Sequence, residues 1–164
     1  MAEEVCKHDL NNSCLSIFNF GIGSGLMALE VLKRNRKVSI LGVDILPEMI
    51  ERARERLEFW QSQVSLICGD GCKLIRWVGD NKFDVFISGY ALHIIPREDR
   101  LNLLNNIYRV LKPNGLFITA DKIVSDDLQH YREDNQLRRI VIVGEFKNLL
   151  REAGFIDVKE IFHN

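Results

Sequence analysis

Residues 17–25 read IFNFGIGSG, and this stretch decides the fold that the chain is expected to adopt. An apolar run over residues 15–20 predicts a buried strand, and the helical pattern GLMALEVLKRN follows it, with Ser24 as a candidate N-cap. Gly21, Gly23 and Gly25 stand at the junction. Glycines let the backbone turn sharply and let a ligand approach, and the N-terminus of the next helix favours a phosphate or a carboxylate. Taken alone, this pattern is also typical of a purely structural turn.

The segments around the turn repeat the alternation of strand and helix. Short apolar runs predict further strands at residues 37–43, 64–68, 83–88, 116–120 and 155–162. Amphipathic patterns predict helices from Pro47, around 72–78, over 97–111 and over 145–153, while residues 140–143 fit either state. This alternation predicts an α/β fold: a doubly wound, mostly parallel, Rossmann-like sheet of about six strands with helices on both faces.

Length and composition indicate a single domain over residues 1–164. The chain has 164 residues, of which 46% are hydrophobic and 27% charged, which is an ordinary globular composition. Residues 1–13 are polar and are expected to form a flexible lead-in, and residues 121–137 are expected to be irregular.

Charge and hydropathy limit the partners and the compartment. The net charge of -1 gives no general attraction to nucleic acid, although a local patch could still bind it. The one basic cluster, residues 33–37, is expected to be a solvated helix end on the side away from the ligand crevice. No signal peptide and no membrane-spanning run is recognisable, so we expect a cytoplasmic protein. Its four cysteines are expected to be reduced thiols, and no zinc-site spacing predicts a metal.

In a doubly wound sheet the ligand crevice lies beyond the carboxyl ends of the strands, and acidic residues follow two of the predicted strands. Asp44 comes after the second strand, at the usual distance from a glycine loop for a carboxylate that accepts both hydroxyls of a ribose. Its alternative role is to cap the next helix. Asp70, between Gly69 and Gly71 after the third strand, could reach an exocyclic amine such as adenine N6, or could simply shape a turn.

The fourth predicted strand ends in residues that could border a reacting group. Ser88 is small and leaves room at the centre of the sheet, and Tyr90 could face a cation. His93 could act as a general base for an oxygen or nitrogen nucleophile. The alternative for His93 and Tyr90 is ordinary packing in the wall of a pocket.

Together these motifs resemble the class I S-adenosylmethionine-dependent methyltransferases. The resemblance covers roughly residues 15–121, with a weaker match near the C-terminus, and is closest to branches that act on small molecules or on tRNA wobble positions. It is carried by the segments FGIGSG, GVDILPEMIERARE, CGDG, FDVFISGYALHII, LNNIYRVLKPNGLFITAD and LLREAGFIDVKEIF.

The resemblance implies a role for each residue of the expected cofactor site. Gly21, Gly23 and Gly25 would line the methionine part of S-adenosylmethionine, and Asp44 would hold its ribose. Ile45 would pack on the adenine, Asp70 with Gly71 would meet the adenine edge, and Ser88 would border the methyl group. The complete set is Asn19, Gly21, Gly23, Gly25, Asp44, Ile45, Asp70, Gly71 and Ser88.

The sequence departs from the family pattern in two places. Asn19 stands where the family usually has an acidic residue that contacts the cofactor's ammonium group, and the loss of charge is expected to weaken binding by ~1–2 kcal/mol. The family's seventh strand is missing, so we expect either a shortened sheet or a homo-oligomer in which a neighbouring chain completes it.

Three functions remain open on this basis. The resemblance favours a methyltransferase that uses S-adenosylmethionine and acts on an unidentified small-molecule or RNA acceptor. No catalytic residue is obligatory, because the cofactor carries the reactivity. Asn19 and the short C-terminus leave open a non-catalytic, methyltransferase-like partner subunit. A nicotinamide-dependent oxidoreductase is less favoured, because Leu26 stands where GxGxxG requires its last glycine.

Overall fold

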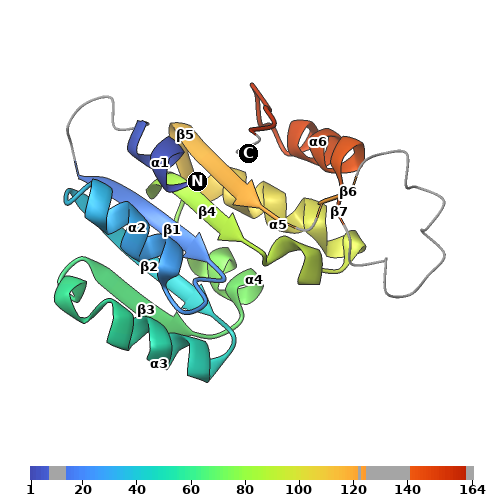
Figure 1. The fold of residues 1–164 in the computed structure, drawn as a ribbon. Coiled ribbons are helices and arrows are strands. Elements are labelled where there is room, and N and C mark those ends of the chain that lie inside the picture. Colours follow the sequence, from blue (N-terminus) through green and yellow to red (C-terminus); the bar gives the residue numbers. More distant parts are fainter. Residues whose placement is uncertain (8–13, 122, 125–140, 162–164) are drawn as a thin grey trace.

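Five parallel strands form the centre of the molecule in the computed structural model, which describes residues 1–7, 14–121, 123–124 and 141–161 (Figure 1). The strands lie in the order β3-β2-β1-β4-β5. Their bounds are Leu15–Phe20 for β1, Val38–Asp44 for β2, Val64–Cys68 for β3, Phe83–Gly89 for β4 and Leu111–Ala120 for β5. The prediction of a doubly wound parallel sheet is therefore confirmed.

The register of the strands brings their carboxyl ends to one level. Phe20 of β1 is paired with Val43 of β2 on one side and with Ser88 of β4 on the other. The chain winds outward from β1 to β3 and then crosses back to β4, so the switch point lies between β1 and β4. A ligand crevice is expected at this switch point.

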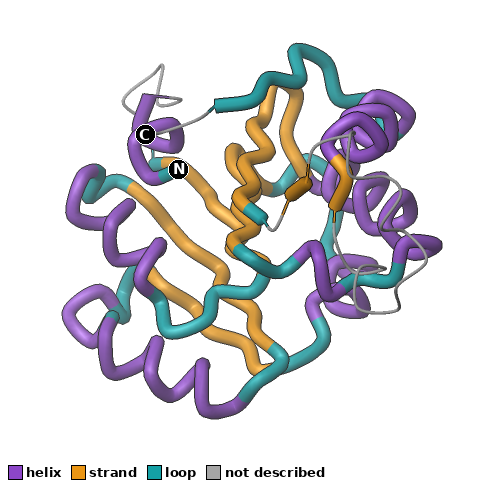
Figure 2. Tube along the Cα trace, turned by 45° about the vertical axis from the view of Figure 1, so that its right-hand side comes forward, coloured by secondary structure: helices purple, strands orange, loops and turns teal. Residues whose placement is uncertain are grey.

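Helices cover both faces of the sheet, as Figure 2 shows. On one face lie α1 (Ala2–Lys7), α2 (Leu26–Arg34) and α3 (Pro47–Arg56), and on the other α5 (Arg97–Val110) and α6 (Val143–Glu152). Shorter elements are η1 (Glu58–Trp60), α4 (Gly71–Leu74), η2 (Ile75–Trp77) and η3 (Leu92–Ile94), and the two-residue strands β6 (Ile123–Val124) and β7 (Val141–Ile142) pair with each other.

The two cores differ in character because strand residues alternate between faces. Towards α5 and α6 the sheet presents aromatic side chains: Phe18 stacks on Phe86 with ring centroids 4.9 Å apart, and Phe83 and Phe117 meet this pair edge-on. Towards α1, α2 and α3 it presents aliphatic side chains such as Ile17.

Three local predictions were wrong. Residues 2–7, predicted as part of a flexible lead-in, form α1, because Val5 is fully buried in the core beneath α2. The N-cap of α2 is Gly25 rather than Ser24, since the backbone there takes φ 80, which glycine adopts without strain. Residues 155–161 form no strand, so the main sheet has five strands rather than about six.

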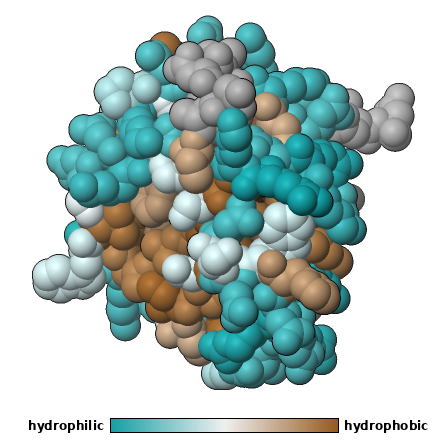
Figure 3. Space-filling view, turned by 90° about the vertical axis from the view of Figure 1, so that its left-hand side faces the viewer, coloured by the Kyte–Doolittle hydropathy of each residue, from teal (hydrophilic) through white to brown (hydrophobic). Residues whose placement is uncertain are grey.

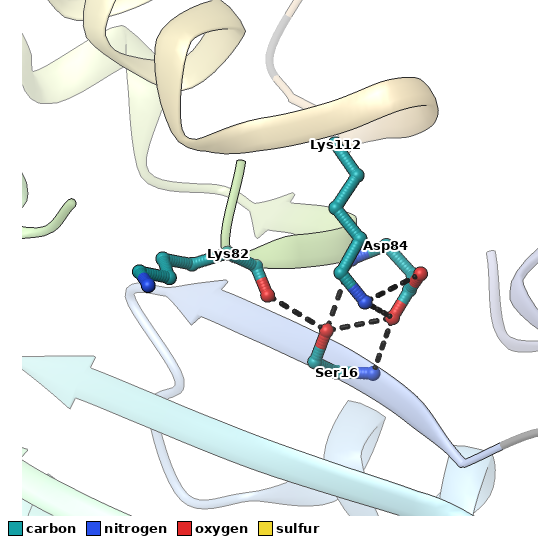
Figure 4. Close-up of polar contacts among 4 residues, drawn as sticks. All are labelled: Ser16, Lys82, Asp84 and Lys112. Atoms are coloured by element: carbon teal, nitrogen blue, oxygen red, sulfur yellow. Dashed lines mark hydrogen bonds and ion pairs between the residues drawn. The ribbon is translucent and has the colours of Figure 1, made fainter. Parts of the chain in front are cut away.

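The amino ends of β1, β4 and β5 are tied together by a polar network (Figure 4). Asp84 Oδ2 accepts a hydrogen bond from the Ser16 N–H at 2.8 Å and lies 2.6 Å from the Ser16 hydroxyl. Lys112 Nζ donates to both carboxylate oxygens of Asp84, at 2.9 and 2.8 Å. This network fixes the alignment of the strands at the end remote from the crevice.

β1, β4 and β5 begin near the left side of the molecule in Figure 1. Figure 3 views this side, and it shows a group of apolar side chains with hydrophilic residues around it.

The basic cluster of residues 33–37 precedes β2 at the amino end of that strand, and its Lys and Arg side chains are exposed, as predicted. Lys33 and Arg34 pair with Glu30 on the same helix. No helix in the described part of the chain is long and apolar enough to cross a membrane.

Candidate functional site

The glycine loop joins β1 to α2 at the switch point, and its three glycines all have positive φ. A Cβ on Gly21 would lie 2.7 Å from the Ala91 side chain, and one on Gly25 would lie 3.0 Å from Leu57. A Cβ on Gly23 would meet nothing within 4 Å. Packing therefore explains two of the glycines, and Gly23 alone presents open backbone to a ligand.

Asp44 connects this loop to the end of β2. Its Oδ2 accepts a hydrogen bond from Gly23 N at 2.8 Å, and its Oδ1 accepts one from Leu46 N at 3.1 Å. The second bond forms a turn before α3, whose N-cap is Leu46, so Asp44 does not cap this helix as the alternative interpretation of the sequence proposed. A carboxylate has about four acceptor positions, so Asp44 can still accept the two hydroxyls of a ribose.

Asp70 and Ile45 lie at the edge of one cavity. Asp70 caps α4, with Oδ1 accepting from Cys72 N at 2.9 Å and from Lys73 N at 3.3 Å, so its turn-forming role is real. Ile45, which is 66% exposed, lines the same cavity of about 380 Å³. The remaining lining comes from residues 72, 73 and 76 and from the segment 95–106. An apolar side chain exposed beside a carboxylate suits a purine ring.

Gly71 has a packing role that the sequence did not reveal. A Cβ at Gly71 would lie 2.6 Å from the ring of Phe20, which is buried at the end of β1.

Burial raises the pKa of the neighbouring Cys72 thiol to about 11, and the charges of Asp70 and Asp99 add to the effect. Cys72 therefore stays protonated at neutral pH and is a poor nucleophile.

Two buried polar atoms near the switch point have no hydrogen-bond partner among the described residues. They are Asn19 Nδ2, on a side chain that is 2% exposed, and Ser88 Oγ, which is fully buried. Asn19 is paired in register with Ile87, so its side chain lies on the opposite face of the sheet from that of Ser88. Unpaired buried polar groups are costly, so a ligand that supplies their partners would be stabilised.

His93 is part of a buried pair that the sequence reasoning did not identify. Its Nδ1 lies 2.6 Å from Asp121 Oδ1, and the Asp121 side chain is 1% exposed. Asp121 directly follows β5, so the expectation that site residues follow the strands, which selected Asp44 and Asp70, could have found it.

Arg100 of α5 is also buried. Its burial lowers the pKa of the guanidinium, whereas the charge of Asp121 acts in the opposite direction.

The residues present fit S-adenosylmethionine. The open face of Gly23 and the orphaned amide of Asn19 would hold its amino-acid end, Asp44 its ribose, and Ile45 with Asp70 its adenine. The free atom of Asn19 is a donor, which suits the carboxylate of the methionine group better than its ammonium. The described residues contain no cluster of metal-binding side chains. The prediction that the four cysteines are free thiols is confirmed.

Comparison with known proteins agrees with this geometry. The methyltransferase domain family matches residues 17–115. A carboxy-S-adenosyl-L-methionine synthase from Glaesserella parasuis is 34% identical over 116 residues, which are 68% of this chain and 46% of the relative. The corresponding enzyme of Actinobacillus pleuropneumoniae is 30% identical over 139 residues, 84% of this chain and 53% of the relative. The chain thus spans about half the length of the curated relatives it matches.

Solved structures show the same fold at low sequence identity. The [4+2]-cyclase SpnF superposes with a TM-score of 0.77 at 21% identity, covering 93% of this chain and 55% of its own. Phosphoethanolamine N-methyltransferase 2 of Haemonchus contortus, solved with S-adenosyl-L-methionine, has a TM-score of 0.71 at 22% identity, covering 93% and 36%. On the match over residues 17–115, and with a fold that agrees, the chain belongs to the methyltransferase domain family.

Proposed function

We propose that the chain binds S-adenosylmethionine and transfers its methyl group to an unidentified small-molecule or RNA acceptor. The observation that carries the proposal is the junction of the glycine loop with β2. There the open backbone of Gly23 lies within hydrogen-bond distance of the Asp44 carboxylate, at 2.8 Å. A fold that also hosts a cyclase does not fix the reaction, so the assignment depends on this site.

The chain's own residues would bind and orient the cofactor, whose sulfonium supplies an activated methyl group when it is bound. Asp44 would hold the ribose from the end of β2, and Asp70 with Ile45 would fix the adenine in the adjoining cavity. With both anchored, the open backbone of Gly23 would hold the methionine end at the switch point. Positioning of this kind accounts for a large part of the rate enhancement in group transfer.

Calorimetric titration with S-adenosylmethionine, S-adenosylhomocysteine and NAD in parallel tests the proposal. We expect the first two to bind and NAD not to bind. Asp44→Ala should weaken binding about 100-fold, because a charged acceptor for two hydroxyls is lost. Glu55→Ala, which removes an exposed carboxylate on α3, is the matched control and should leave the affinity unchanged. Binding of NAD alone, or equal affinities of wild type and Asp44→Ala, would contradict the proposal.

A second candidate, a non-catalytic partner subunit, is favoured by Asn19, which leaves a buried neutral amide where the family has a charge. This candidate predicts that neither S-adenosylmethionine nor S-adenosylhomocysteine binds in the same titration. The groove of about 500 Å³ between β5 and residues 155–161 is where a second copy would complete the sheet. Sedimentation over a range of concentrations would test that dimer, and a monomer at every concentration would exclude it.

A further inference from the structure

A largely buried acid–base pair lies at the carboxyl ends of β4 and β5. The His93 imidazole, carried by η3 directly after β4, contacts Asp121 directly after β5, with Nδ1 2.6 Å from Oδ1. The His93 side chain is 16% exposed and that of Asp121 is 1% exposed. The pair thus has one shielded member and one that solvent or a ligand can reach.

The hydrogen bonds of Asp121 determine which nitrogen of His93 carries the proton. Oδ2 accepts from Leu92 N at 2.7 Å and from His93 N at 3.4 Å, so the carboxylate is held by backbone donors. A carboxylate only accepts hydrogen bonds, and therefore Nδ1 must donate to Oδ1. In the neutral imidazole this leaves the lone pair on Nε2, for which no described residue supplies a hydrogen bond.

The segment that carries His93 borders the proposed cofactor site on two sides. Ala91, two residues before it, touches the glycine loop at Gly21. Ile95 and Pro96, directly after η3, line the cavity shared with Ile45 and Asp70. His93 therefore lies between the expected positions of the two ends of the cofactor, near the switch point.

The side chains around His93 indicate what kind of acceptor would fit. Tyr90 and Ile94, which lie close to His93 in the sequence, are 65% and 59% exposed, so the segment that carries His93 offers apolar surface to a ligand. Tyr90 also holds a left-handed backbone conformation, φ 55, and its N–H bonds to Ala120 O at 2.8 Å. A large side chain in this conformation is uncommon and is often found at functional sites.

We propose that His93, positioned by Asp121, is the general base of the reaction and that the methyl acceptor is a hydroxyl on an apolar molecule, a phenol or an alcohol. This inference rests on the proposed function. The hydroxyl O–H bond breaks and its proton moves to Nε2, while an oxygen–carbon bond forms to the methyl group. The carbon–sulfur bond breaks, and its electron pair stays on sulfur. A thioether or tertiary amine needs no such base, because it has no proton to lose.

Asp121→Asn provides a test that a merely structural role would not satisfy. The amide oxygen should take the position that faces Leu92 N and His93 N, because only an acceptor is satisfied there. The amide NH₂ then faces Nδ1, which must become an acceptor, and the proton moves to Nε2. Nitrogen-15 NMR of the imidazole should therefore show the Nδ1–H tautomer in the wild type and the Nε2–H tautomer in the variant. The matched control is Asp80→Asn, which alters a carboxylate paired with Arg109 far from the site.

Transfer assays complete the test. We expect methylation of phenols or alcohols in a panel that pairs each hydroxyl compound with its thioether and tertiary-amine analogue. His93→Gln and Asp121→Asn should each lower kcat at least 100-fold, while calorimetry shows unchanged affinity for S-adenosylhomocysteine. An Nε2–H tautomer in the wild type would overturn the inference. So would an enzyme that binds the methyl donor but methylates only thioethers or amines, or none of the panel. These outcomes would leave the proposed function intact. If the wild type does not bind S-adenosylmethionine, the proposed function is overturned, whichever tautomer His93 has.

Discussion

Replacing Asp84 by asparagine tests whether the network at the amino ends of the strands stabilises the fold. The Asp84 carboxylate, whose side chain is 23% exposed, meets the Ser16 N–H and hydroxyl and the Lys112 ammonium group (Figure 4). Asparagine has nearly the same shape and keeps one carbonyl acceptor. The substitution therefore removes the charge and one acceptor with little change in packing.

The expected loss follows from these contacts. A hydrogen bond to a charged group contributes about 1 kcal/mol more than a neutral one, and two of the contacts are made by the backbone and hydroxyl of Ser16. The Lys112 side chain is 41% exposed, so solvent screens its attraction and its share is small. We therefore expect Asp84→Asn to lower the free energy of unfolding by about 2 kcal/mol at pH 7.

The loss should depend on pH in a definite direction. Burial alone raises the pKa of the Asp84 carboxyl, but the hydrogen bonds from Lys112 and Ser16 outweigh it, so the pKa lies below its ordinary value. A depressed folded pKa means that the stabilisation is present above the unfolded pKa of about 3.9 and disappears as pH falls through the folded value. The difference between wild type and variant should therefore shrink in acid.

Urea unfolding at a series of pH values measures this difference. Asp80→Asn is the matched control, because the Asp80 side chain is 65% exposed and pairs with Arg109 at 2.6 Å. Its loss should stay below about 1 kcal/mol. Equal losses in the two variants, or a loss at Asp84 that does not shrink as the pH falls, would refute the assignment of the stabilisation to the ionised Asp84 carboxylate.

Three further predictions concern the core and the crevice. Gly71→Ala places a Cβ 2.6 Å from the Phe20 ring and should lower the free energy of unfolding by about 1–3 kcal/mol in urea titrations, whereas an unchanged midpoint would contradict the packing. Phe18→Ala, which removes the ring stacked on Phe86, should cost about 3–5 kcal/mol in the same measurement. Asn19→Asp should weaken S-adenosylhomocysteine binding about tenfold in calorimetry, because the free donor of Asn19 suits the cofactor's carboxylate and an acidic side chain would repel it, whereas tighter binding would show that this position contacts the ammonium group.

The sheet could be predicted from the sequence because each strand carries its own local signal. The apolar runs of β1 to β4 and the turns after them are short and contiguous, so their positions were right to within one residue. The residues at their carboxyl ends are then placed by topology alone, which is why Asp44 and Asp70 could be predicted to lie at the crevice.

Long-range contacts account for the errors. α1 exists because Val5 packs under α2, and nothing in its polar sequence reveals that contact. Residues 155–161 have strand-like composition, but a strand requires a paired neighbour, and β5 does not pair with them. The close packing of Ala91 against Gly21 and of Phe20 against Gly71 also could not be predicted, while the ligand roles of these glycines stay predictions.

The pair of His93 and Asp121 shows the same limit within the site. Each residue follows a strand and could be selected singly, but their 2.6 Å contact exists only because β4 and β5 are neighbours with Gly89 opposite Ala120. A base candidate without its carboxylate is hard to distinguish from a pocket wall. The contact determines the tautomer, and the tautomer gives His93 a specific role.

Asn19 determines how the affinity for the cofactor should be distributed over the site. A neutral amide with one free donor can contribute one ordinary hydrogen bond, about 0.5–1.5 kcal/mol, whereas Asp44 offers a charged acceptor to two hydroxyls. Binding should therefore depend more on the ribose and adenine than on the amino-acid end. It follows that Asn19→Ala should weaken binding less than Asp44→Ala, and that 5′-methylthioadenosine, which lacks the amino-acid end, should bind almost as well as S-adenosylhomocysteine. A large preference for S-adenosylhomocysteine would mean that the glycine loop and Asn19 hold that end more firmly than one neutral hydrogen bond allows.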